Sequence, residues 1–139
     1  GWIFEGFGLY LSYRLVNTRL SFFIRRTEYT DGEKSNFNSR LRQSRANWFR
    51  LAHEVLVGED KPNLVFVLGK DVNQLTPEDL LYGYALAAFI LEVHGDKAAR
   101  ILTRIGKEDP PALVLEEELG RKLPELEKHL IRWLDDVKS

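Results

Sequence analysis

Hydrophobic positions recur at helical spacing along most of the chain, and the clearest single element lies in its second half. Thr76 can cap a helix whose first residue is Pro77, and Glu78 and Asp79 complement the dipole of the first turn. The helix that they open extends to about His94. Because this helix is apolar nearly all round, we expect it to be the buried centre of the fold.

Other stretches share an apolar stripe with a glycine or proline near an end. We expect helices at 2–16, 44–57, 96–105 and 111–119, and from Pro124 onward. Gly6 and Gly8 are costly inside a helix, so we expect a close approach of another backbone or a ligand there, or an early helix end. The run at 18–30 fits either period, and the run at 64–68 is expected to be a buried strand or an extended linker, which leaves a short strand or hairpin open at each. The expected fold is mainly α, a compact bundle of about five to six helices in a single domain over residues 1–139.

Composition excludes several classes of protein. A chain of 139 residues with 44% hydrophobic and 29% charged residues can bury one core and is not typical of a disordered protein. The absence of cysteine excludes disulfides, thiolate metal sites and a cysteine nucleophile. No apolar run reaches the roughly 20 residues that span a bilayer, so we expect no membrane span.

The first residues carry a recognisable motif. Trp2 is followed after two residues by Glu5 and Gly6, and an aromatic segment then ends in Tyr10 and Leu11. This order resembles the peptidase-MA-like zinc metallopeptidases, the gluzincins. In that family the glutamate is the third zinc ligand, and the other two ligands are the histidines of an upstream HExxH helix. The resemblance therefore implies a metal-ligand role for Glu5.

Weaker matches continue in the family's order. They comprise the helix from Tyr82 to Gly95, the segment 112–120, and the segment 123–127 with the tryptophan–leucine pair at 133–134. The resemblance implies that Tyr82 or Tyr84 donates a hydrogen bond to the oxyanion of the tetrahedral intermediate. The alternative for both is a core aromatic residue whose hydroxyl reaches a polar partner. The resemblance also implies zinc in the intact family domain and an extracytoplasmic or cell-envelope setting.

One departure from the family decides what this chain can do by itself. The chain has no HExxH motif, because His53 and Glu54 are followed at the second histidine position by Val57. We therefore expect the C-terminal helical portion of a metallopeptidase-like domain, without a cofactor or peptidase activity as an isolated chain. Its partners would be the missing N-terminal peptidase half or a peptide substrate. A degenerate domain kept for its structure remains an alternative.

The three histidines do not form a motif. His53, His94 and His129 lie on three separate predicted helices, with no pair three or four residues apart. We therefore do not expect a three-histidine metal site.

Charge is unevenly distributed and supports an alternative function. Residues 11–50 contain nine basic and three acidic residues, a net charge of +6, which leaves −7 for the remainder of a chain of net charge −1. A non-catalytic helical interaction module could use this region to bind an acidic protein or nucleic acid, through Arg25, Arg26, Arg40, Arg42 and Arg45. Nucleic acid is not favoured, since no recognised binding motif is present, and a solvated face paired with the acidic half explains the same charges. The glutamate run at 116–118 is likewise expected to be a solvated face.

Overall fold

The central helix α6 (Pro77–Val93) organises the molecule. The computed structural model describes residues 3, 6–8, 10–11, 47–59 and 61–139. Of the 17 residues of α6, 13 are buried, as expected for a helix that is apolar on all sides. It starts at the predicted cap residue Thr76, where a capping box forms: the Thr76 hydroxyl accepts from the Asp79 amide at 3.1 Å and the Asp79 carboxylate accepts from the Thr76 amide at 2.9 Å.

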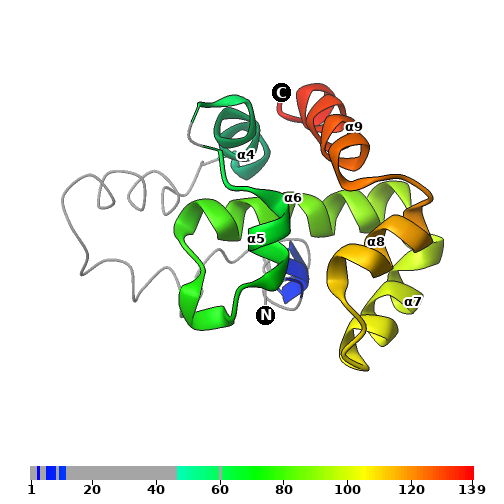
Figure 1. Cartoon of the computed structure of the whole chain (residues 1–139). Coiled ribbons are helices and arrows are strands. Elements are labelled where there is room, and N and C mark those ends of the chain that lie inside the picture. Colours follow the sequence, from blue (N-terminus) through cyan, green and yellow to red (C-terminus); the bar gives the residue numbers. More distant parts are fainter. Residues whose placement is uncertain (1–2, 4–5, 9, 12–46, 60) are drawn as a thin grey trace.

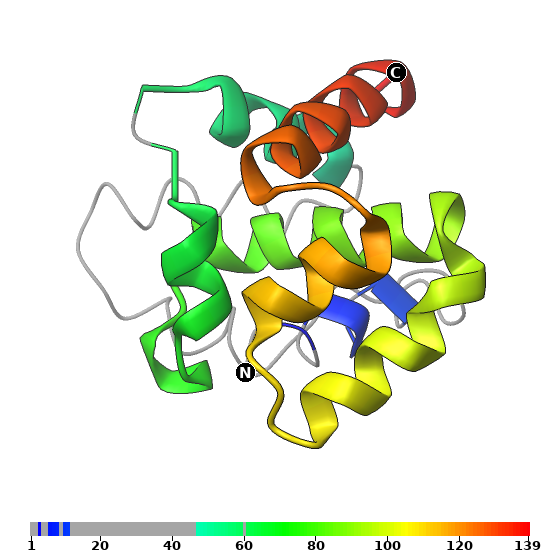
Figure 2. The same cartoon turned by 45° about the vertical axis from the view of Figure 1, so that its right-hand side comes forward.

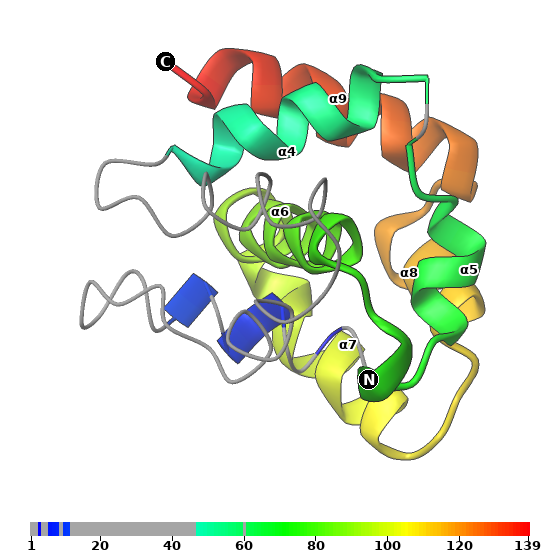
Figure 3. The same cartoon turned by 90° about the vertical axis from the view of Figure 1, so that its left-hand side faces the viewer.

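The other helices surround α6. They are α4 (Trp48–Val57), α5 (Leu64–Gly69), the short 3₁₀ helix η1 (Val72–Gln74), α7 (Gly95–Gly106), α8 (Pro111–Leu119) and α9 (Leu123–Val137) (Figure 1). Figure 3, in which α6 is viewed nearly along its axis, shows α4 and α9 side by side, α5 beside α8, and α7 on a further side. Figure 2 shows α8 in front of α6, between α7 and α9. The predicted mainly α bundle is confirmed for the described residues.

The apolar run at 64–68 is a helix, so the expectation of a buried strand or an extended linker is wrong there. The Asn63 side chain caps it by accepting from the Val65 amide at 2.9 Å. Leu64, Val67 and Leu68 are buried while Val65 and Phe66 are exposed, which is the i, i+3, i+4 spacing of a helix face. A strand would instead have buried alternate residues. The other proposed strand, at 18–30, lies outside the described residues.

The first described residues are helical and pack against α6. Ile3, Phe7 and Tyr10 are buried in the core, and the phenolic oxygen of Tyr10 donates to Glu92 at 2.5 Å. A Cβ added to Gly6 would lie 2.7 Å from the carbonyl carbon of Gly83, closer than non-bonded atoms approach. The expected close backbone approach is therefore present at Gly6.

Helix ends agree with the sequence at some positions and differ at others. Gly120 ends α8 in the left-handed conformation with φ of 66°, which agrees with the helix predicted over 111–119. At the end of α6, His94 is the junction residue and Gly95 already opens α7, which starts one residue before the predicted boundary. In the part of the chain that the structure describes, no helix has the length and apolar character needed to cross a membrane.

Candidate functional site

The best-defined polar arrangement begins at the start of α6 and sets the orientation of that helix. Asp79 is buried, and besides closing the capping box it accepts a hydrogen bond from the ammonium group of Lys70 at 2.6 Å. Because the first turn is held by three hydrogen bonds, the next residues of α6 point in defined directions. Tyr82, Gly83 and Tyr84 then face three different neighbours.

Tyr82 points toward α9 and is fully buried. Its hydroxyl donates to the Oε2 atom of Glu127 at 2.7 Å, and the Oε1 atom of Glu127 accepts from the ammonium group of Lys61. Burial raises the pKa of Tyr82 far above its ordinary value, and the hydrogen bond to Glu127 and the negative charge of Glu127 raise it further. The hydroxyl therefore stays protonated and acts as a hydrogen-bond donor that is already engaged.

The Glu127 carboxylate, which accepts from both Tyr82 and Lys61, lies at the surface of the molecule. Lys61 and Glu127 line a hollow of about 400 Å³ between α5 and α9, together with Leu64, Val65 and Ile131. Tyr82 does not line this hollow, since its ring lies behind Glu127 in the core. A ligand in the hollow would meet Lys61 and Glu127 first.

Tyr84 belongs to an aromatic cluster. Its ring centroid lies 5.1 Å from that of Trp48, 5.5 Å from that of Phe49 and 5.9 Å from that of Tyr10. Aromatic pairs at such separations stabilise a core beyond their buried area. Both tyrosines are thus core residues in this structure, and their role as oxyanion donors stays a prediction.

Glu5, the predicted zinc ligand, lies outside the described residues. Its neighbours Ile3 and Gly6 belong to the helical segment that packs on α6 next to Gly83. The described residues on either side of Glu5 in the sequence therefore pack against the helix that carries the two tyrosines. The alternative binding residues Arg25, Arg26, Arg40, Arg42 and Arg45 also lie outside the described residues.

The described residues do not form a zinc site by themselves. They contain no group of three or more histidine, aspartate or glutamate side chains arranged to hold a metal ion. A catalytic zinc needs three protein ligands, and Glu5 would supply one of them. We therefore derive no zinc-dependent step for this chain alone.

The structure keeps one of the three histidines apart, as the sequence predicted, and brings the other two together. The Nε2 atom of His53 on α4 lies 3.5 Å from the Oδ1 atom of Asp135 on α9. His94 and His129 line one cavity of about 310 Å³, together with Arg121, Trp133 and other residues. Sequence spacing could not reveal this, because the two histidines are 35 positions apart and meet only through packing of α6 on α9.

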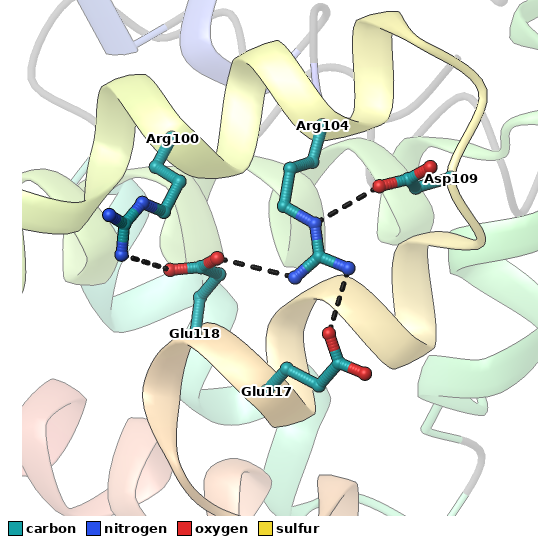
Figure 4. Close-up of polar contacts among 5 residues, drawn as sticks. All are labelled: Arg100, Arg104, Asp109, Glu117 and Glu118. Carbon is teal, nitrogen blue, oxygen red and sulfur yellow. Dashed lines mark hydrogen bonds and ion pairs between the residues drawn. The ribbon is translucent and has the colours of Figure 1, made fainter.

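The glutamate run at 116–118 is a solvated face only in part, because Glu117 is exposed whereas the Glu118 side chain is 11% exposed. Arg104 on α7 contacts Glu117 at 2.8 Å, Glu118 at 3.2 Å and Asp109 at 3.0 Å, and Arg100 also reaches Glu118 at 3.6 Å (Figure 4). Hydrogen bonds to Asp109 and Glu117 raise the pKa of Arg104. These ion pairs connect α7 to α8 and stabilise the packing of the two helices.

Similarity to known proteins adds no assignment. No family model, curated protein or solved structure matches this chain. The function is therefore argued from the motif order and the packing alone.

Proposed function

We propose that this chain is the C-terminal helical portion of a peptidase-MA-like zinc metallopeptidase domain. The observation that carries the proposal is the order of the matches, from Trp2, Glu5 and Gly6 at the start to the segments 112–120 and 123–127 near the end. Each match is weak by itself, and it is their common order along one chain that supports the proposal.

The packing is compatible with this proposal. Gly6, next to the candidate ligand Glu5, lies against the backbone of Gly83, and Tyr10 of the same motif stacks near Tyr84. Glycine at position 6 thus has a physical reason here, because a side chain there would push its segment and α6 apart. The matched segments at 112–120 and 123–127 fall on α8 and α9 of the same bundle.

In this proposal the chain supplies Glu5 as one carboxylate ligand and α6 as its support. The two histidine ligands and the general-base glutamate would come from polypeptide outside these 139 residues, since only His53, His94 and His129 are present here. Bound zinc would polarise the peptide carbonyl and activate water. Tyr82 would have to exchange its bond to Glu127 to reach a substrate oxygen.

The test uses the natural gene product that contains this chain. We expect it to hold about one zinc ion per chain and to hydrolyse peptides, measured by atomic absorption and a fluorogenic peptide assay. Glu5→Gln should weaken zinc binding by at least about 100-fold, because loss of even a ligand's hydrogen-bond partner costs about 10- to 100-fold. The matched control is Glu59→Gln, at an exposed position between α4 and α5, which should leave zinc binding unchanged.

Two results would refute the proposal. The natural product could bind no zinc and hydrolyse no peptide, or Glu5→Gln could retain zinc as tightly as the control. Binding of an acidic protein that weakens steeply with salt, without zinc, would instead support the interaction module built on residues 14–50.

A further inference from the structure

The cavity between the end of α6 and α9 collects polar side chains of complementary chemistry. Its volume is about 310 Å³, and its polar lining residues are His94, Arg121, His129 and Asp136. On α9, His129 and Asp136 are seven residues apart with Trp133 between them, so all three share one face of the helix. Arg121 comes from the connection between α8 and α9.

These four side chains are unpaired within the described part of the chain. None of them makes a side-chain hydrogen bond or an ion pair there, and none has an interaction beyond those described. Their sequence neighbours behave differently. Asp135 contacts both His53 and Lys138, and Lys122 contacts Glu116 at 3.0 Å. The four polar groups at this cavity are therefore available to a ligand, whereas Asp135 and Lys122 are already engaged.

The apolar wall of the cavity is aromatic. The ring centroid of Phe89 lies 5.3 Å from that of His94 and 5.6 Å from that of Trp133, both in edge-to-face orientation. Trp133 is held in turn by Phe49 at 5.4 Å. The aromatic wall is thus fixed by packing, and one part of it remains accessible from the cavity.

The charges of the side chains that line the cavity indicate which kind of ligand it can bind. Burial lowers the pKa of His94, Lys97 lowers it further, Asp96 opposes this, and Arg121 and His129 add smaller lowering contributions. His94 is therefore neutral at neutral pH. The fixed charges that line the cavity are then one positive group, Arg121, and one negative group, Asp136.

The other nearby charges are neutralised or outside the lining. Glu125 faces both Arg121 and His129, and its carboxylate contacts Lys128 at 3.1 Å. Lys97 and Asp96 lie on α7 and offset each other at His94. A simple anion or a simple cation would leave one of the two fixed charges unmatched. A metal ion is not supported, because no metal-holding group occurs among the described residues.

We propose that this cavity binds a small zwitterion with an aromatic side chain, namely a free aromatic amino acid. Arg121 pairs with its carboxylate, Asp136 with its ammonium group, and Trp133 and Phe89 contact its ring. The two imidazoles supply hydrogen bonds at the cavity wall. The volume lies at the small end of ligand pockets, which begin at about 300 Å³, and this suits an amino acid rather than a longer peptide.

The test is isothermal titration calorimetry of the 139-residue chain with three related ligands. We expect L-phenylalanine to bind with a Kd of about 1 mM or tighter. Phenylacetate, which lacks the ammonium group, and phenethylamine, which lacks the carboxylate, should each bind at least about tenfold more weakly, since each loses one charge-assisted contact.

Substitutions at two exposed positions test which side chain binds the carboxylate of the ligand and which binds its ammonium group. Arg121→Gln should weaken binding of L-phenylalanine about tenfold, and Asp136→Asn should do the same while leaving phenylacetate binding unchanged. The matched control is Arg132→Gln, on the exposed side of α9 and outside the cavity lining, which should bind L-phenylalanine like the unmodified chain. Circular dichroism of each variant checks that it is folded.

Each contrary result overturns the proposal. Equal binding of phenylacetate and L-phenylalanine would show a simple anion site, and equal binding of phenethylamine would show a cation site. No heat of binding from any of the three ligands up to about 10 mM would show that the cavity is not an amino-acid site. The comparison of ligands on the unmodified chain decides the matter even if a variant does not fold.

Discussion

Gly6 and Gly8 lie two residues apart in the same helical segment, and the structure predicts opposite effects of alanine at the two positions. A Cβ at Gly6 would lie 2.7 Å from the carbonyl carbon and 3.3 Å from the Cα atom of Gly83, both of which are backbone atoms. A Cβ at Gly8 would meet nothing within 4 Å, and Gly8 is exposed.

The effect of Gly6→Ala on the unfolding free energy has two opposing contributions. Carbon atoms normally approach to about 3.5 Å, so Gly6→Ala would force the segment and α6 apart by roughly 1 Å. Such overpacking costs about 1–3 kcal/mol, and the better helix propensity of alanine recovers about 1 kcal/mol. Backbone atoms cannot avoid the clash by changing a rotamer, and the separation would also loosen Ile3, Phe7 and Tyr10 in the core. We therefore expect a net loss of up to about 2 kcal/mol of unfolding free energy.

Gly8→Ala has only the favourable term. We expect it to stabilise the chain by about 0.5–1 kcal/mol, because alanine loses less conformational entropy than glycine in a helix. Urea unfolding followed by far-UV circular dichroism measures both variants against the unmodified chain. If Gly6→Ala proves as stable as Gly8→Ala, the close contact between Gly6 and Gly83 is not present in solution and the reasoning fails.

Four further predictions concern polar contacts and the protonation of His94. Tyr82→Phe removes a hydroxyl bond to a carboxylate and should lower the unfolding free energy by about 1–2 kcal/mol in urea titrations; an unchanged midpoint would contradict the bond. Arg104→Gln should lower the melting temperature more than Arg100→Gln, because Arg104 contacts three carboxylates and Arg100 one; equal effects by calorimetry would argue against the cluster. Lys97→Gln should raise the pKa of His94 in an NMR titration, since it removes a positive charge beside the imidazole, and an unchanged pKa would rule this out. The folded state resists protonation of His94, so stability should fall as the pH drops below about 6.5, and His94→Gln should reduce that fall.

The start and burial of α6 could be predicted because the information is local. Thr76, Pro77 and Asp79 satisfy the first amides of the helix wherever it packs, and residues apolar on every side can only be buried. Gly120 ended α8 for the same reason, since few residues other than glycine adopt its backbone angles without strain.

The conformation of the short apolar run at 64–68 could be decided only from the tertiary structure. The run at 64–68 suits a helix or a strand by propensity alone. It became a helix because Leu64, Val67 and Leu68 face the core together while Asn63 caps the first turn. Only the position of the core decides which of the two spacings buries more apolar surface.

The sequence alone therefore determined the helices that have strong local signals, the absence of an HExxH motif and the resemblance that points to Glu5. Tertiary structure alone decided which side chains meet. Tyr82 bonds to Glu127 across 45 residues, and His94 meets His129 across a cavity, because helix packing brings together positions that no local spacing relates. Contacts between helices depend on crossing angles and on the residues that permit close approach, and these are properties of the assembled bundle.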